Sequence, residues 1–373
     1  MKPLYVFIFT CLLFVHTSCA QENTPVIETP TQVNYTTELI VDGIEIPWGM
    51  AFISANEILV TEKSGILYRV IDGQKAEITG VPKIYNRGQG GLLDIALHPE
   101  FIHNNIIYFT AASSMGDDLG GNTALYSAIL VNNSLKNIKV IYKATPNTKK
   151  GQHFGSRIAI DNEGHIYFSV GDRGNRDENP QNIDRDGGKI YRLNLDGSIP
   201  LNNPFIKSEN AIKAVYSYGH RNPQGMIIHP KTNKIWVNEH GPKGGDEINI
   251  IKEGKNYGWP KITYGINYSG TSITDITKKE GMEQPFYYWV PSIAPSGMAF
   301  LTSNIYEGWK GNLFVGSLKF EYLERLVIRN NKIVKREKVL DKIGRVRNIK
   351  QGPDGFLYIS VEGKGILKII PIK

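Results

Sequence analysis

The segment IAIDNEGHIYFSV, residues 158–170, contains the unit from which the fold can be read. A short apolar strand centred on Ala159 leads into the turn Asp161-Asn162-Glu163-Gly164, and a second strand, Ile166–Val170, is almost continuously apolar. Asp, Asn and Gly favour tight turns, and short runs of β-branched and aromatic residues between turn signals favour buried strands. The segment therefore predicts a β-hairpin that is covered on both faces.

This hairpin pattern occurs six times along the chain. The first strands centre on Ala51, Ala96, Ala159, Ile227, Ala299 and Lys350. The second strands are Ile58–Thr61, Ile106–Thr110, Ile166–Val170, Ile235–Asn238, Leu313–Gly316 and Leu357–Val361. Successive centres lie 45 to 72 residues apart, which suits a four-stranded sheet with its loops. Because no convincing amphipathic helix separates these units, they predict an all-β fold, a six-bladed β-propeller.

Polar residues flank the hairpins at one end. Those before the first strands are Gln89, His153, Arg221, Asn222, Arg345 and Arg347. Those after the second strands are Asp172, Gly241, Pro242 and Lys319. The start of the first strand and the end of the second share one edge of an antiparallel hairpin, so we expect all of them on one face near the central channel. The cations among them would converge without matching acids and would attract a polyanionic small molecule.

The start of the chain has a different composition from the rest. Residues 1–20 contain the apolar run Leu4–Val15, which is too short to span a membrane and predicts an export signal. Residues 21–39 are polar and predict a tether, and residues 40–373 lack an internal linker and predict one propeller domain. Cys19 resembles the lipidated cysteine of a lipoprotein signal, so both periplasmic release and a lipid anchor at the cell envelope stay open.

Charge and motif content exclude several function classes. The net charge is +7, but Lys and Arg alternate with acids rather than forming a long run, so we do not expect nucleic acid as a partner. A zinc-type Cys/His cluster and a glycine-rich nucleotide turn are both missing from the sequence. His98 and His229, each followed by Pro at the same place in the repeat, are assigned to turns. A monomer and a homodimer both remain open.

An ordered set of motifs resembles the soluble quinoprotein sugar dehydrogenases, the glucose/sorbosone dehydrogenase family that uses pyrroloquinoline quinone (PQQ). The motifs are Gly88–Asp94, His153–Arg157, Gly219–Gly225, Glu239–Pro242, Gly245–Asn249 and Asn256–Pro260. They occur in this order between Trp48 and Ile370, and the short loops look most like the aldose sugar dehydrogenase branch. The resemblance implies oxidation of a small-molecule sugar at C1 to a lactone, with PQQ and Ca²⁺ as cofactors and an unknown electron acceptor.

The resemblance also implies roles for individual residues. His153 would be the general base that takes the C1 hydroxyl proton, which suits an imidazole because its pKa lies near working pH. The hairpin geometry places Asp172 to hold that ring, and Arg221 is the third expected catalytic residue. The expected PQQ contacts are Gln89, Arg221, Asn222, Tyr268, Lys319, Arg345 and Arg347. The arginines at 345 and 347, two apart on one strand, would face the same side and pair with carboxylates.

Calcium is implied at two places. One ion would use the main-chain carbonyl groups of Gly241 and Pro242 together with the cofactor, since carbonyl oxygens suit a hard cation. The second would use Glu247 and the main-chain carbonyl of Tyr257, in a structural role.

Two other functions remain as alternatives. A calcium-dependent propeller lactonase would call for carboxylates around the axis, whereas the expected rim is cationic. A non-catalytic sugar-binding propeller would be favoured by loss of His153 or the arginine pair, and both are present. The fold by itself does not decide which of these functions the protein has.

Overall fold

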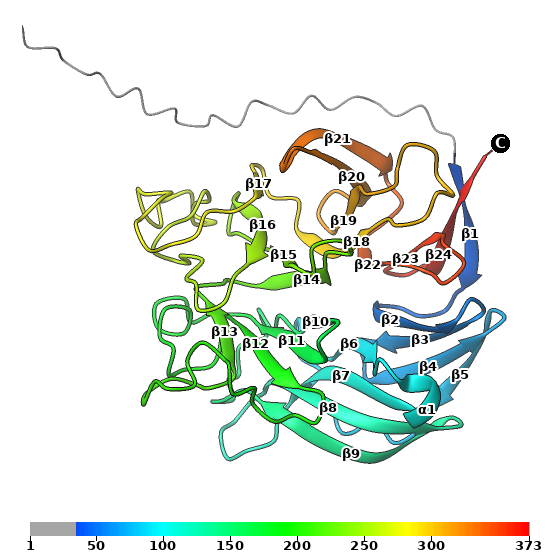
Figure 1. The fold of residues 1–373 in the computed structure, drawn as a ribbon, viewed down its shortest axis with the longest axis horizontal. Coiled ribbons are helices and arrows are strands. Elements are labelled where there is room, and N and C mark those ends of the chain that lie inside the picture. Colours follow the sequence, from blue (N-terminus) through cyan, green and yellow to red (C-terminus); the bar gives the residue numbers. More distant parts are fainter. Residues whose placement is uncertain (1–34, 373) are drawn as a thin grey trace, which may run out of the picture.

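The structure, a computed structural model, describes residues 35–372. Six four-stranded antiparallel sheets are arranged as blades around a central axis (Figure 1). The one helix of the described residues, α1 (Phe101–Asn104), is a single turn between two strands. The predicted all-β, six-bladed β-propeller is therefore confirmed.

The strands follow one another from the axis outward in each of the first five blades. The first blade contains β2 (Pro47–Ser54), β3 (Glu57–Glu62), β4 (Ile66–Ile71) and β5 (Gln74–Ile78). The second contains β6 (Leu92–Leu97), β7 (Ile106–Ser113), β8 (Asn122–Val131) and β9 (Ser134–Lys143). The third contains β10 (Ile158–Ile160), β11 (His165–Val170), β12 (Lys189–Asn194) and β13 (Val215–Tyr218). The fourth contains β14 (Pro223–Ile228), β15 (Ile235–Glu239), β16 (Asp246–Ile251) and β17 (Tyr287–Trp289). The fifth contains β18 (Pro295–Phe300), β19 (Leu313–Ser317), β20 (Tyr322–Arg329) and β21 (Lys332–Leu340).

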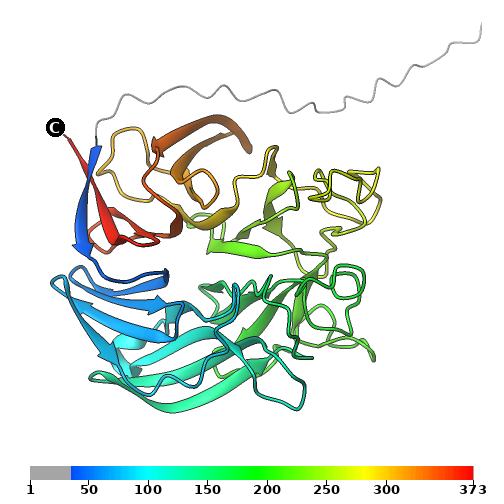
Figure 2. The ribbon, with the colours of Figure 1, turned by 180° about the vertical axis from the view of Figure 1, so that it is seen from behind.

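The sixth blade joins the two ends of the described chain. It consists of β22 (Val346–Gln351), β23 (Leu357–Val361), β24 (Gly365–Pro371) and β1 (Tyr35–Val41). Strand β1 pairs antiparallel with β24, with Tyr35 opposite Pro371, and the blue and red strands lie side by side from both directions (Figures 1 and 2). The ring is thus closed by backbone hydrogen bonds between the first and last strands.

This closure corrects one predicted boundary. Residues 35–39, which we expected in the polar tether, belong to β1 and hence to the propeller. Residues 21–34 of the predicted tether, and the predicted export signal 1–20 with Cys19, lie outside the described residues.

Both strands of every predicted hairpin are present. The six expected first-strand centres fall in β2, β6, β10, β14, β18 and β22, which contact one another around the axis. The six expected second strands fall in β3, β7, β11, β15, β19 and β23. All residues of β15, β19 and β23 are buried, because adjacent blades cover both faces of these strands.

The two His-Pro sites have the expected turn role. The Nδ1 atom of His98 accepts a hydrogen bond from the backbone of Glu100 at 3.0 Å, and that of His229 accepts one from Lys231 at 3.1 Å.

Across the described residues, no helix has both the length and the apolar character needed to cross a membrane.

Candidate active site

A cavity of about 830 Å³ opens on one face of the propeller at its centre. Seven of the expected site residues line it: Gln89, Gly241, Pro242, Tyr268, Lys319, Arg345 and Arg347. Gln89 and Arg345 lie just before the innermost strand of a blade, and Arg347 lies at the start of such a strand. Gly241, Pro242 and Lys319 lie just after the second strand of a blade, and only Tyr268 among the seven lies elsewhere. Repeat topology thus brings together residues that are far apart in the sequence.

One buried arginine, Arg157, contacts three of the residues that line this cavity. Arg157, just before β10, donates from Nε to the carbonyl of Gln224 at 2.6 Å and from Nη2 to that of Arg347 at 2.9 Å. Its Nη1 lies 3.1 Å from Asp94 Oδ1, and the guanidinium lies 3.9 Å from the centroid of the Trp48 ring. One side chain therefore links five of the six blades.

His153 and Asp172 form a hydrogen-bonded pair at the edge of the cavity. His153 Nδ1 lies 2.6 Å from Asp172 Oδ1, and the His153 backbone N–H donates to Gln89 Oε1 at 2.7 Å. His153 is not itself among the cavity-lining residues, but its neighbours Gln89 and Phe154 are. An ionised carboxylate only accepts, so Nδ1 carries the proton and Nε2 keeps its lone pair.

The surroundings of Asp172 fix its carboxylate. Oδ1 also accepts from the Gly174 backbone at 2.7 Å, and Oδ2 accepts from the indole of Trp259 at 2.8 Å. Burial alone would raise the pKa of Asp172, but the hydrogen bond from His153 and the charge of Arg221 lower it below its usual value. Asp172 is therefore ionised at neutral pH.

The imidazole of His153 is kept neutral by its environment. Burial lowers the pKa of His153, the Asp172 hydrogen bond opposes this shift, and the charges of Arg221 and Arg173 lower the pKa further. A neutral imidazole with a free Nε2 has the form that a general base requires.

Arg221 and Asn222 precede β14 and lie beside this pair. Arg221 donates from Nη1 to the carbonyl of Gly241 at 2.7 Å. The Oδ1 atom of Asn222 accepts from the Gly155 backbone at 3.2 Å. The buried Nδ2 group of Asn222 has no hydrogen-bond partner among residues 35–372. Because an unpaired buried amide is costly, this group is suited to an acceptor oxygen on a bound molecule.

The turn at Gly241 and Pro242 is anchored by a buried carboxyl group. Asp246 accepts from the backbone of Gly241 and of Ala294, both at 2.8 Å. A Cβ at Gly241 would lie 2.2 Å from the Gly245 carbonyl oxygen, so only glycine fits there. The carbonyl of Pro242 accepts from the Ser292 hydroxyl at 3.2 Å.

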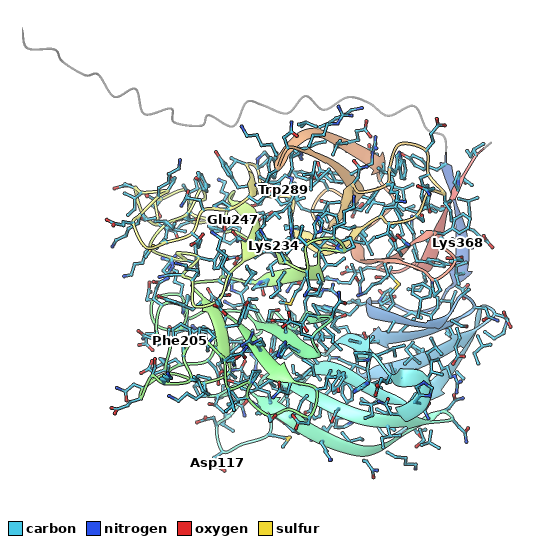
Figure 3. All side chains as sticks on the ribbon, viewed as in Figure 1. Asp117, Phe205, Lys234, Glu247, Trp289 and Lys368 are labelled. Carbon is cyan, nitrogen blue, oxygen red and sulfur yellow. The ribbon has the colours of Figure 1, made fainter. Side chains whose placement is uncertain are left out.

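Glu247 and Tyr257 line a separate, much smaller cavity of about 10 Å³, which also borders Arg221 and Gly241. Figure 3 shows Glu247 on β16, near the labelled Trp289 of β17. Burial, and then the charge of Glu239, raise the pKa of Glu247 to about 8. The amide of Asn249 donates to both carboxylates at 3.0 Å, while its Oδ1 has no partner within the described residues. The carboxylates of Glu239, which is buried, and Glu247, which is partly buried, line this cavity and offer oxygen donors that fit a hard cation.

We expected Arg345 and Arg347 to have no acidic partner, but both are paired with the same carboxylate. Glu362, just after β23, binds Arg345 Nε at 2.6 Å and pairs with Arg347 through both Nε and Nη2. Arg345 lies just before β22 rather than within it, but the shared carboxylate shows that both side chains point the same way. The expectation of unmatched cations is therefore wrong for this pair.

Other predicted contacts are more exposed. Lys319 forms no ion pair with any residue from 35 to 372, and its ammonium group lies 4.9 Å from the centroid of the Phe320 ring. Tyr268 lies in the loop between β16 and β17 and is 74% exposed, so its ring is available to a ligand at the mouth.

Lining residues that the sequence reasoning did not predict include Lys63, His240 and Glu362. Lys63 and Glu362 follow β3 and β23, the same repeat position as Asp172 and Lys319, so the repeat itself was the signal. His240 Nε2 lies 2.8 Å from the Pro295 carbonyl, and burial and the Arg221 charge lower its pKa to about 3. His240 is therefore a neutral wall residue.

The fold and its cavity define a β-propeller protein with a polar ligand site at the mouth of its channel. Residues 44–368 match the model of the Glucose / Sorbosone dehydrogenase family. The chain belongs to this family.

Individual relatives agree with this assignment. The chain is 39% identical over 352 residues to aldose sugar dehydrogenase YliI of Escherichia coli (strain K12), covering 92% of this chain and 94% of the relative. The apo-form crystal structure of the soluble aldose sugar dehydrogenase from Escherichia coli has a TM-score of 0.85 at 36% identity, covering 90% of this chain and 99% of that one. The PQQ-bound aldose sugar dehydrogenase from Streptomyces coelicolor has a TM-score of 0.74 at 25% identity, covering 92% and 99%. These likenesses support a sugar dehydrogenase of the PQQ-type propeller class.

Proposed function

We propose that the protein oxidises aldose sugars at C1 to lactones, with PQQ and Ca²⁺ as cofactors and His153 as general base. The observation that carries this proposal is the 2.6 Å pair of His153 and Asp172 at the edge of a large, cation-bearing cavity. The Streptomyces coelicolor relative with the same fold is a PQQ-bound enzyme, which supports the choice of cofactor.

The residues of the cavity fit a flat, polyanionic molecule with carbonyl oxygens. Lys63, Lys319 and Arg345 line the cavity and offer positive charge to carboxylates. Asn222 does not line the cavity but contacts the lining residue Gly155, and its unpaired amide offers a donor to an oxygen. Gln89, Arg221, Arg347 and Tyr268 complete the set that would hold PQQ. When bound, PQQ would supply a quinone that accepts the hydride from C1 of the sugar.

The protein's own part in the reaction is to move a proton. His153 Nε2 would accept the proton of the C1 hydroxyl group as the carbon loses its hydride. The imidazolium that results is stabilised by Asp172, which lies 2.6 Å from Nδ1 and is itself held by Trp259 and Gly174. Because the carboxylate is fixed before the reaction, little reorganisation is needed as charge develops on the ring.

Two calcium sites belong to this proposal. The carbonyls of Gly241 and Pro242 would bind an ion next to the cofactor, where it would act as a Lewis acid. Glu247 and the main-chain carbonyl of Tyr257 would bind the second ion. Burial and the charge of Glu239 raise the pKa of Glu247, and a bound cation would lower it again by favouring the ionised carboxylate. We also infer that the chain is exported to the periplasm or to a lipid-anchored position at the envelope.

Reconstitution tests the proposal. Protein dialysed against a chelator should be inactive, and PQQ with Ca²⁺ together should restore reduction of an artificial dye by aldoses, with lactone as product. Omitting either component, or supplying a nicotinamide cofactor instead, should give no activity. Full activity after chelation would refute the cofactor assignment. Hydrolysis of lactones with Ca²⁺ alone would favour the propeller lactonase, and saturable sugar binding without turnover would favour a non-catalytic propeller.

A further inference from the structure

Arg173 directly follows Asp172 and is one of the largest fully buried side chains of the protein. Its guanidinium donates to the carbonyl of Gln152, to that of Lys150 at 2.9 Å and to that of Gly121 at 3.1 Å. The guanidinium carbon also lies 3.4 Å from the centroid of the Phe154 ring. Arg173 therefore contacts the backbone before His153 and the side chain after it.

The segment that carries His153 needs such support. His153 has a φ of 57°, in the left-handed region that non-glycine residues seldom adopt. Gln89 fixes the segment from the opposite side, since its backbone N–H donates to the Gly151 carbonyl and its side chain accepts from His153, both at 2.7 Å. A Cβ at Gly171 would lie 2.3 Å from the His153 carbonyl oxygen, so the segment has little room to relax. An unfavourable backbone conformation persists only where its surroundings determine it fully.

The charge of Arg173 also acts on the imidazole. The charged groups that face His153 are Asp172, Arg173 and Arg221, and the two arginines both lower its pKa. Burial lowers the pKa of Arg173 to about 10, while the adjacent Asp172 opposes this shift, so the guanidinium keeps its charge at neutral pH. The neighbouring residues Asp172 and Arg173 therefore shift the pKa of the His153 imidazole in opposite directions.

We propose that Arg173 is a positioning residue for His153, which holds residues 150–154 in the conformation that aims the ring. The catalytic part of this inference rests on the proposed function, in which His153 is the base. The geometric part rests only on the contacts of the guanidinium. Lysine is a poor substitute here, because a single ammonium group lacks the planar fork that reaches three carbonyl groups and stacks on a ring.

Three variants separate positioning from simple stability. Arg173→Met keeps volume but removes the charge and all three carbonyl contacts, and Arg173→Lys keeps the charge without the fork. Arg192→Met is the matched control in the same blade. Arg192 is also buried, donates to Asn202 and Asn203, and lies 5.1 Å from the centroid of the Tyr216 ring. It has no hydrogen bond, ion pair or ring contact with residues 150–154.

The first readout needs neither cofactor nor activity. The His153 imidazole would be titrated by NMR in histidine-labelled, PQQ-free protein, with His153→Gln used to assign its signal. Arg173→Met should raise the His153 pKa and change its chemical shift, whereas Arg192→Met should leave both as in the wild type. Arg173→Lys should change the chemical shift but move the pKa much less.

The second readout uses the PQQ- and Ca²⁺-loaded protein. For Arg173→Met we expect kcat to fall by about 10²-fold, the scale of a 1 Å misplacement, with KM changed less than about twofold. The acidic limb of its pH–rate profile should move to higher pH, because the imidazole stays protonated longer. Arg173→Lys should lose about tenfold in kcat without that shift.

Each outcome separates the two claims. If Arg173→Met is folded and keeps the wild-type His153 titration and kcat, the positioning role is refuted. If Arg173→Met does not fold, an unchanged kcat and chemical shift in Arg173→Lys refutes it instead. If the wild type oxidises no aldose but the His153 titration still responds only to the Arg173 variants, the positioning role stands and the proposed function fails.

Discussion

Replacing Glu362 by Gln should lower the stability of the apoprotein and raise its affinity for PQQ. Glu362 is shared by Arg345 and Arg347, so it occupies the two guanidinium groups that we assign to the cofactor's carboxylates. The uncharged amide would release them. Folding and cofactor binding are therefore expected to respond in opposite directions to one substitution.

The size of each effect follows from exposure. The side chains of Glu362 and Arg347 are only 16% and 12% exposed, so breaking their pair should cost about 2–3 kcal/mol, somewhat below the loss for a fully buried pair. Arg345 is 44% exposed and should add less than about 1 kcal/mol. With the competing carboxylate removed, PQQ affinity should rise about tenfold, which is ~1.4 kcal/mol.

The stability effect has a defined dependence on pH. Burial would raise the pKa of Glu362, but Arg347 and Arg345 lower it below its usual value. A depressed carboxyl pKa contributes stability above the unfolded-state pKa and loses it as the pH falls through the folded-state pKa. The difference between wild type and Glu362→Gln should therefore be largest near neutral pH and should shrink in acid.

Urea denaturation of the apoprotein at several pH values and titration with PQQ in the presence of Ca²⁺ would measure both effects. Glu280→Gln is the control, because it makes the same charge change at an exposed position. It should alter neither quantity appreciably. An unchanged or weaker PQQ affinity in Glu362→Gln would refute the assignment of these arginines to the cofactor.

Two further predictions concern the same cavity. His153→Gln should bind PQQ within a few-fold of wild type but lose roughly 10²–10⁴ in kcat, the usual contribution of a positioned base; normal turnover in a dye-reduction assay would exclude His153 as the base. Arg345→Ala combined with Arg347→Ala should weaken PQQ binding steeply and make reconstitution sensitive to salt, because it also leaves Glu362 as an unpaired anion. Binding titrations at low and high ionic strength would detect this, and wild-type affinity would show that the pair has no role in the site.

The inner half of each blade could be predicted from the sequence, and the outer half could not. The first two strands of a blade are covered on both faces, so they are nearly continuously apolar between turns. Outer strands such as β5, with four of its five residues exposed, carry little apolar signal. Strand β1 was missed for the same reason, since only Tyr35 and Val41 are buried in it and the remainder depends on backbone pairing with β24.

Within the candidate site, the repeat located individual residues but not their partners. The rule that residues after a second strand reach the cavity places Lys319 there, and for β3 and β23 it also gives Lys63 and Glu362. The same rule locates Asp172 beside the cavity, where it pairs with His153. The hairpin pairs Val346 with Val361, so the residues just outside that pair are neighbours. The contact between Arg345 and Glu362 was therefore implicit in the predicted hairpin. By contrast, the contacts of Arg157 cross the axis between blades, and no local pattern encodes them.

The charge arrangement also explains why an acid lies within a cationic site. Burial, and next the charge of Arg347, lower the pKa of Lys63, so the positive charges of Arg347 and Lys63 repel each other. Glu362 offsets part of this repulsion and orients both guanidinium groups before any ligand arrives. A polyanion must then compete with Glu362, so some affinity is given up in return for a folded and preorganised apoprotein. On this reasoning the carboxylate is part of the binding site, and the opposite signs expected for Glu362→Gln follow from that single arrangement.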